Sequence, residues 1–251
     1  MLESIISGGA KKPAPIPVDE NVVFLSHFEH SPPIDVVTGV VATWMNTGYY
    51  ATQPILTDPA GAKFGSGHVR HGGTTSGANE YIRFPKGFTL GTRDFTIESW
   101  HLWSEVSRPQ GSGQYGWEIG LDDQYYCGLT FTGTRYNSGI NLTINRGYNS
   151  AVAHNLFVPG LFELPVNEYF HVAVVREGTM LRVYLGGKLA ASLDIGTLAI
   201  HEGSWVNLAQ SNNAYQPWCS LDEMRIVVDQ ALYSGSTIIV PKGPFPDPIP
   251  A

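Results

Sequence analysis

The chain has 251 residues, of which 43% are apolar and 15% are charged, and its formal net charge is −7. All-β sandwiches commonly reach roughly 200–250 residues as one unit, so this length suits a single large domain. Nucleic-acid binding depends on clustered Lys and Arg. The 15 basic residues here are scattered, which excludes DNA and RNA as main partners. No apolar run approaches the ~18 residues of a membrane-spanning helix, and the N-terminus lacks the basic-then-apolar pattern of a signal peptide. We therefore expect no membrane partner and synthesis in a cytoplasm without conventional export.

Proline spacing sets the two ends of the chain apart from the middle. Residues 11–17 (KKPAPIP) place a proline at every second position from Pro13 to Pro17. Because proline fixes φ and removes a hydrogen-bond donor, such a segment favours an extended conformation and cannot join the interior of a sheet. Residues 241–250 (PKGPFPDPIP) are also rich in proline, with one at every second position from Pro244 to Pro250. The sequence thus predicts an extended N-terminal arm over residues 1–20 and one domain over residues 21–251 that ends in a proline-rich strap.

The middle of the chain reads as β-strands throughout. Short runs of apolar and β-branched residues, some alternating with polar ones, are bounded by turns rich in glycine and proline. The predicted strands are 22–28, 81–84, 95–100, 139–144, 170–175, 181–185, 189–193 and 220–228. In 95–100, alternation places Phe95 and Ile97 on one face and Glu98 and Trp100 on the other. Glycine-bearing turns join the three strands between 170 and 193 into a meander, and residues 229–233 (DQALY) fit one turn of helix.

The order of these segments resembles the laminin-G-like, concanavalin-like domains found in many bacteriophage structural proteins. The segments that carry the resemblance are 24–29 (FLSHFE), 63–67 (KFGSG), 94–100 (DFTIESW), 169–176 (YFHVAVVR), 181–187 (LRVYLGG), 221–226 (LDEMRI) and 231–234 (ALYS), followed by 244–246 (PFP). The resemblance covers about residues 22–246 and implies an all-β fold, a two-sheet antiparallel β-sandwich (concanavalin-like jelly roll) with adjacent first and last strands. Two departures stand out: Glu29 replaces the usual aspartate, and segment 104–168 is longer than usual.

Glycoside hydrolysis, which other proteins of this fold perform, requires two carboxyl groups that face the scissile bond. On a strand, side chains of one face are two residues apart, yet no Glu-x-Asp pattern occurs in the chain. The nearest acidic groups are Glu118 with Asp122 and Asp123, and the adjacent pair Asp222 and Glu223. Adjacent strand residues point to opposite faces, so we expect that this pair cannot act together. The sequence therefore predicts no catalytic residues and no enzyme activity, with a polysaccharide hydrolase as the less favoured alternative.

No metal-binding signature is present among the scattered histidines, so no cofactor is expected. Asp122 and Asp123 leave two alternatives open, a calcium site completed by loop carbonyls or a plain polar turn. The two cysteines, Cys127 and Cys219, either join in a disulfide across the sandwich or remain two buried thiols.

Aromatic residues gather in the long segment 104–168 and just before it. They suit stacking on sugar rings, protein interfaces and core packing, and the sequence leaves these three uses open. The candidates for glycan or protein contact are Trp103, Tyr115, Trp117, Tyr125 and Tyr126.

The resemblance points to a non-enzymatic structural protein of a bacteriophage virion, such as a capsid decoration or another surface protein. It would be made in the host cytoplasm and would contact other virion proteins of the capsid or tail, with copies associating symmetrically. The N-terminal arm would anchor it through Leu2, Ile5, Ile6, Pro13, Pro15 and Ile16. The alternative is a lectin-like adsorption module that binds a glycan of the host surface.

Overall fold

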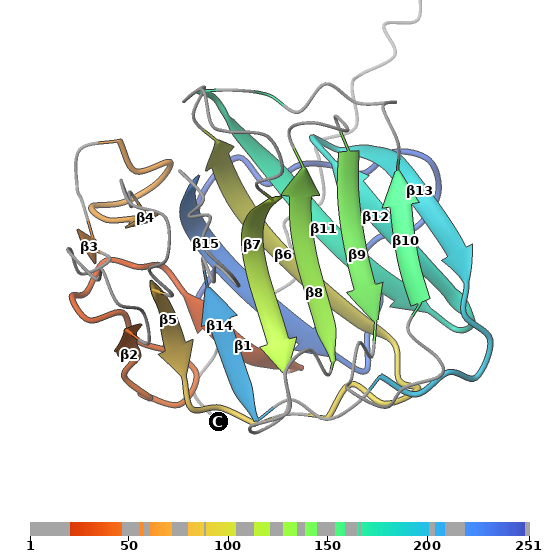
Figure 1. The fold of residues 1–251 in the computed structure, drawn as a ribbon, viewed down its shortest axis with the longest axis horizontal. Helices are drawn as coiled ribbons and strands as arrows, with labels where there is room; N and C mark the ends of the chain where they lie inside the picture. The colour runs from red at the N-terminus through yellow and green to blue at the C-terminus, as the bar shows by residue number, and fades with distance from the viewer. Residues whose placement is uncertain are drawn as a thin grey trace, which may run out of the picture.

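The computed structural model shows two antiparallel β-sheets packed face to face (Figure 1), which confirms the predicted β-sandwich. The structure describes residues 21–46, 56–57, 61–71, 80–87, 89–103, 113–120, 128–134, 139–144, 154–158, 165, 167–200, 204–208 and 219–248. These residues form strands, turns and loops, and within them there is no helix, hence none long and apolar enough to cross a membrane. The predicted N-terminal arm, residues 1–20, lies outside the described residues.

The first sheet has β6 and β15 at its centre. Its order is β13 (Lys188–Asp194), β12 (Met180–Leu185), β11 (Tyr169–Glu177), β6 (Phe95–Trp103), β15 (Cys219–Val228), β4 (Val69–His71) and β3 (Leu56–Thr57). Strand β1 (Val22–Ser26) also pairs with β15. The meander β11–β12–β13 and the adjacency of the first and last strands are therefore confirmed.

The second sheet lies over the first and is nearer the viewer in Figure 1. Its order is β10 (His154–Val158), β9 (Gly139–Ile144), β8 (Leu129–Thr134), β7 (Gly113–Gly120), β14 (Trp205–Leu208), β5 (Glu80–Phe84) and β2 (Thr43–Asn46). Strands β7 to β10 form a meander, whereas β14 enters the sheet between β7 and β5. Residues far apart in the sequence thus become neighbours at β5 and β14.

The main core fills the space between the sheets with alternate residues of each strand. Phe95 and Ile97 of β6 pack there with Val172 and Val174 of β11, while Glu98 and its neighbours on the same face point away. The face assignment predicted for 95–100 is confirmed. Burial of so many large apolar side chains, each contributing roughly 1.5–3 kcal/mol, supplies most of the driving force for folding.

A second apolar layer covers the outer face of the first sheet. The C-terminal segment 229–248 lies on this face, where Phe245 packs on Leu25 and Val227, and Ile238 packs near Val175. Its backbone pairs with the β12–β13 turn, since Ile238 N donates to Gly187 O at 2.8 Å. Strand β11 is consequently buried on both faces, which explains its nearly continuous apolar sequence.

The helical turn predicted at residues 229–233 is absent. Leu232 N donates instead to Thr96 Oγ1 at 2.9 Å, and the Tyr233 hydroxyl donates to Glu98 at 2.8 Å. Because these tertiary hydrogen bonds satisfy the Leu232 N–H and the Tyr233 hydroxyl without a helix, they override the local helical preference of the segment. Residues 241–248, part of the segment expected as a C-terminal strap, are described and lie outside the strands.

Candidate functional site

The outer face of the first sheet carries a buried charged cluster around Glu98. Arg225, opposite Glu98 on β15, donates to Glu98 Oε1 through Nε at 2.9 Å and also through Nη2. Glu98 Oε2 accepts from His171 Nε2 at 2.9 Å and from the Tyr233 hydroxyl at 2.8 Å. Glu98, His171 and Arg225 are fully buried. The cluster therefore links three central strands to the C-terminal segment.

The charge of Glu98 is held firmly. Burial raises its pKa, but the Arg225 charge and the hydrogen bond from His171 outweigh burial and lower the pKa of Glu98 to about 2. Both of its oxygens are engaged by donors. Glu98 thus has no proton to give near neutral pH and serves as an anchor for the strap.

A β-bulge places the two adjacent carboxylates Asp222 and Glu223 on one side of the sheet. The register of β15 against β6 shifts between Asp222 and Met224, and Glu223 has a φ of 51°. Both side chains reach segments on the outer side of the first sheet. The prediction that they point to opposite faces is wrong, because the bulge suspends the alternation at this point.

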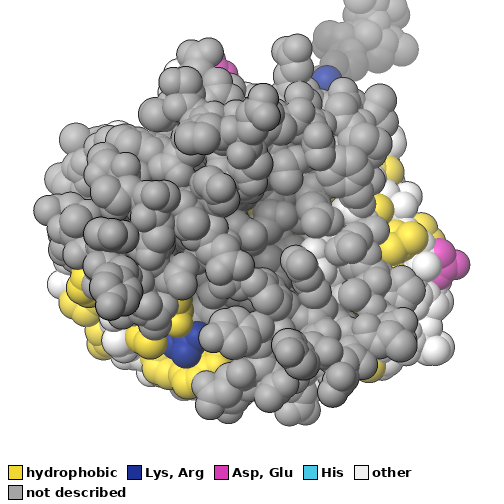
Figure 2. Space-filling view, viewed as in Figure 1, with side chains coloured by type: hydrophobic (Ala, Val, Ile, Leu, Met, Phe, Trp, Pro, Cys, Tyr) yellow, Lys and Arg dark blue, Asp and Glu magenta, His cyan; other side chains and the backbone are white. Residues whose placement is uncertain are grey.

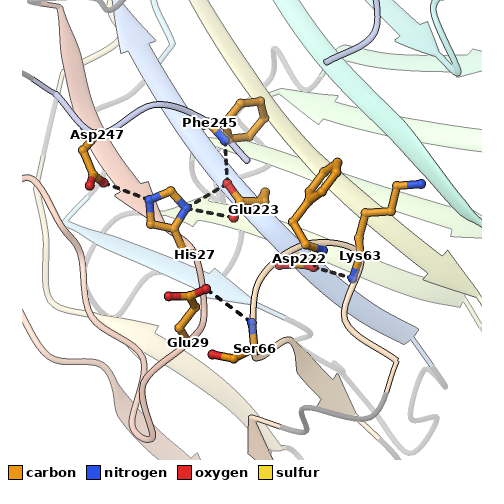
Figure 3. Close-up of polar contacts among 9 residues, drawn as sticks. His27, Glu29, Lys63, Ser66, Asp222, Glu223, Phe245 and Asp247 are labelled. Carbon is orange, nitrogen blue, oxygen red and sulfur yellow. Dashed lines mark hydrogen bonds and ion pairs between the residues drawn. The ribbon is translucent and has the colours of Figure 1, made fainter. Parts of the chain in front are cut away.

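Asp222 fastens the loop before β4. Its Oδ2 accepts from Lys63 N at 2.6 Å and from Phe64 N at 2.9 Å (Figure 3). Burial raises the pKa of Asp222 to about 7, against the backbone hydrogen bond from Phe64 and with the help of the nearby Glu223 charge. Phe64 packs edge-on against Trp100 of β6 at 5.5 Å, so this loop closes over the outer face.

Glu223 fastens both ends of the described chain. His27 Nδ1 lies 2.8 Å from both Glu223 oxygens, and Phe245 N donates to Oε2 at 2.8 Å. On its other side, His27 Nε2 contacts Asp247 at 2.9 Å (Figure 3). Burial lowers the pKa of His27, but hydrogen bonds to Glu223 and Asp247 and their charges outweigh it and raise the pKa to about 9. The imidazolium therefore bridges β1 to the strap.

The glycines of segment 63–67 allow this loop to approach β1 closely. A Cβ on Gly67 would lie 2.4 Å from the Phe28 carbonyl oxygen, and one on Gly65 would lie 2.0 Å from Glu29 Oε1. Glu29, in the position where aspartate is usual, contacts Ser66 N at 3.3 Å. The polar groups of this face thus hold chain segments together, which leaves the second sheet as the candidate contact surface.

A row of polar residues crosses the whole second sheet. Cross-strand partners follow one another from β2 to β10 as Thr43, Arg83, Asn207, Glu118, Thr130, Thr143 and Asn155. Their strand neighbours, such as Ile82, Val206 and Ile119, lie in the core between the sheets. By the two-residue period of strands, Arg83 and Asn207 belong to the outer face.

One part of this row forms a cluster of Tyr81, Arg83, Trp205 and Asn207, called here the Arg83 cluster. The Arg83 guanidinium lies over the Trp205 ring, 4.3 Å from its centroid, and 5.1 Å from that of Tyr81. Arg83 Nε donates to Asn207 Oδ1 at 3.0 Å. Figure 2 shows a basic side chain framed by hydrophobic ones at the end of the molecule where β2, β5 and β14 run. Aromatic rings beside hydrogen-bonding groups are typical of contact surfaces.

A protein-family model of laminin G type, described as the concanavalin A-like lectin/glucanases superfamily, matches residues 76–232, which is more than half of the chain. The chain belongs to this superfamily. No curated protein sequence matches it.

Solved structures share the fold of this concanavalin-like domain at low sequence identity. The binding domain of Paraclostridial Mosquitocidal Protein 1 matches with a TM-score of 0.60 and 15% identity over 86% of this chain and 51% of that one. The botulinum neurotoxin serotype G binding domain matches with 0.56 and 14% over 82% and 47%. A botulinum neurotoxin type C structure matches with 0.52 and 11% over 82% and 47%. The chain spans about half the length of these relatives, and the likeness shows the fold alone.

The predicted contact residues of this concanavalin-like domain are only partly described. Trp117 of β7 is 1% exposed and stacks on Phe131 at 5.5 Å, so of the three alternatives its place is the core. Trp103 and Tyr115 lie on β6 and β7, where the structure describes the backbone. The remaining predicted residues lie outside the described residues: Tyr125, Tyr126 and the arm residues Leu2, Ile5, Ile6, Pro13, Pro15 and Ile16.

The Arg83 cluster was missed in the sequence, although Tyr81-x-Arg83 and Trp205-x-Asn207 both show the two-residue period of an outward strand face. In the described part of the chain, no group of three His, Cys, Asp or Glu side chains is placed to hold a metal ion. Asp122, Asp123 and Cys127 lie outside the described residues, so the calcium and disulfide alternatives stay open.

Proposed function

We propose that this domain is a non-enzymatic contact module that binds a glycan through the outer face of its second sheet. The Arg83 cluster carries this proposal, because the Trp205 ring and the Arg83 guanidinium are partly exposed there, supported by the buried Tyr81 ring and Asn207 amide. Sugar recognition uses aromatic and hydrogen-bonding groups in such combinations, with a few polar groups fixing the orientation of the ligand. Thr43, which is exposed, extends the surface on the β2 side of the cluster.

The engagement of the acidic residues on the first sheet supports a non-enzymatic role. Glu98 accepts hydrogen bonds at both oxygens and Glu223 contacts His27 through both of its own. Asp222 is tied to the backbone of the loop before β4. A hydrolase needs two carboxyl groups that face a common bond, whereas these carboxylates face strands and loops of their own chain.

The matched toxin structures support binding as the kind of function. Two of them are described as binding domains, and the third concerns cell entry of botulinum neurotoxin type C, which depends on interaction with two ganglioside molecules. Superfamily membership by itself allows lectins as well as glucanases.

A glycan array tests this proposal, with Trp205→Ala as the variant and Trp44→Ala as its control. Trp44 is also a surface tryptophan of the second sheet, 39% exposed, but lies on the edge strand β2 outside the cluster. We expect the unmodified chain to bind a defined set of glycans, W205A to lose about tenfold or more in affinity, and W44A to bind normally. Array-wide absence of binding, or equal losses in both variants, refutes the proposal. Incubation with a bound polysaccharide should release no new reducing ends; their appearance would establish a hydrolase.

We also propose, from the sequence resemblance, that the domain is carried on the surface of a bacteriophage virion. The ordered set of segments from 24–29 to 244–246 is typical of phage structural domains, and the proline-rich residues 1–20 suit an arm laid along capsid or tail proteins. Proline lowers the entropy cost of ordering such an arm. Deletion of residues 1–20 should abolish incorporation into particles while the sandwich still folds. Full incorporation of the shortened chain would contradict anchoring by the arm.

A further inference from the structure

Arg83 is held in one orientation by contacts on several sides. Its Nε is fixed to Asn207 Oδ1 at 3.0 Å, and Asn207 is only 4% exposed. The Trp205 ring supports the guanidinium plane at 4.3 Å, and Tyr81 adds a second ring at 5.1 Å. A guanidinium fixed in this way has lost most of its rotational freedom before any ligand arrives, so little entropy remains to be lost on binding.

The outer end of this guanidinium has no acceptor among the described residues. Both Nη nitrogens lack a hydrogen bond there, since the single hydrogen bond of Arg83 uses Nε. The other arginine side chains that the structure describes are different: Arg225 pairs with Glu98, Arg93 with Asp229 and Arg182 with Glu177. Arg176 donates to backbone carbonyls. Within the described part of the chain, Arg83 is thus a partly exposed cation whose Nη donors have no acceptor.

We propose that Arg83 binds the carboxylate of an acidic sugar through its two Nη groups. This inference rests on the proposed function and narrows it to a class of glycan. The parallel N–H groups of a guanidinium match the two oxygens of a carboxylate, and such paired, charge-assisted hydrogen bonds are strong and directional.

The surroundings of Arg83 favour a sugar over an acidic protein segment as the bearer of that carboxylate. Thr43, which is exposed, lies next to Arg83 in register on β2, and Asn207 lies next to it on β14. The exposed hydroxyl-bearing Thr43 beside the cation suits the hydroxyls of a sugar ring. The chain as a whole carries a net charge of −7, which repels a polyacidic partner. A sugar with a single carboxylate supplies hydroxyls for the groups beside Arg83 and carries little of the negative charge that the domain repels.

The test compares an acidic oligosaccharide with its carboxyl-reduced form, in which the carboxylate alone has become a hydroxymethyl group. Titration calorimetry on the full chain should show about a tenfold or greater preference for the acid, the scale of a paired charge-assisted hydrogen bond. Arg83→Gln should abolish this preference, so that the acidic and the carboxyl-reduced forms bind with equal affinity. Arg83→Lys should keep only part of it, because an ammonium cannot form the paired contact. Arg182→Gln, on the first sheet, should retain the full preference.

The outcomes separate this inference from the proposed function. Binding of both forms with equal affinity refutes the role of Arg83 and leaves glycan binding in place, whereas failure to bind any glycan refutes the proposed function itself. A sulfated counterpart that binds more tightly than the carboxylate refutes the assignment of a carboxylate. Tighter, Arg83-dependent binding of a poly-glutamate peptide refutes the sugar. Equal melting temperatures for R83Q, R83K and the unmodified chain show that the comparison involves folded proteins.

Discussion

Substitution of Glu98 by glutamine tests whether the buried charged cluster holds the C-terminal segment on the first sheet. The change preserves the size of the side chain but removes the carboxylate that faces the buried Arg225. It also puts an amide donor among three groups that donate to Glu98, from Arg225, His171 and Tyr233. Removing one partner of a buried ion pair costs roughly 3–5 kcal/mol, because the remaining charge stays buried without compensation. At about 2–4 °C per kcal/mol for a domain of this size, the melting temperature should fall by about 6–20 °C.

Urea and thermal unfolding at pH 7, followed by circular dichroism, measure this effect against Glu177→Gln. Glu177 is 46% exposed and forms a surface ion pair with Arg182 at 2.7 Å. Exposed pairs contribute at most about 1 kcal/mol, so E177Q should unfold almost as the unmodified chain does. If E98Q is no less stable than E177Q, the buried cluster does not fasten the strap, and the reasoning fails.

Three further predictions concern the same face. The pKa of His27 is raised from 6.5 to about 9, so its contribution to stability is complete below pH 6.5 and is lost as the pH rises through 9. The difference in urea midpoint between the unmodified chain and His27→Gln should therefore shrink between pH 6.5 and 9. A difference that stays constant over this range would contradict the bridge from His27 to Glu223 and Asp247. Gly67→Ala should lower the free energy of unfolding by about 1–3 kcal/mol, because the added Cβ overpacks against the Phe28 carbonyl. Gly243 has open space around it, so Gly243→Ala should change the free energy of unfolding by no more than about 0.5 kcal/mol. Equal effects of the two substitutions would show that Gly67 does not lie close to Phe28. Phe245→Ala should lower the free energy of unfolding by about 3–5 kcal/mol, because the ring is 2% exposed. Ile239 is 64% exposed, so Ile239→Ala should change the free energy of unfolding by less than about 0.5 kcal/mol. Similar stability of both variants would mean that the strap is not packed on the sheet.

Strand positions could be predicted from the sequence because local patterns determine them. Alternation at Phe95 and Ile97 gives the inward face of β6, and the Gly186-Gly187 turn marks the hairpin between β12 and β13. The sequence shows equally well that the chain ends in an extended segment, because proline spacing is a local property. The order of the segments from 24–29 onward resembles a known family, and that resemblance predicted the sandwich topology, including the contact between β1 and β15.

Non-local contacts decided the features that the sequence did not reveal. The bulge at Glu223 depends on partners contributed by His27 and Phe245, which lie far away in the chain. Without these partners, a run such as 219–228 reads as an uninterrupted strand. The segment 229–233 likewise follows its tertiary hydrogen bonds to β6 and not its local helical preference.

The Arg83 cluster was invisible for a related reason. Its residues come from β5 and β14, two strands that are far apart in the sequence and become neighbours when residues 206–208 pair with residues 82–84. Neither strand is unusual by itself, and the choice of β14 as the neighbour of β5 is a property of the whole sheet. The aromatic residues that the sequence did single out follow local composition, which cannot separate a core residue such as Trp117 from a surface one.

The central position of β15 also governs how this chain reaches its native state. Strand β6 pairs along its length with β15, from Phe95 with Val228 to Trp103 with Cys219. During synthesis, β6 therefore leaves the ribosome long before its central partner exists, and β1 waits longer still. Folds dominated by such distant pairings have a high contact order and fold slowly, and their unpaired apolar strands are prone to aggregate meanwhile. Productive folding of this sandwich consequently has to wait for β15, and its yield should rise when a chaperone shields β6 until β15 arrives.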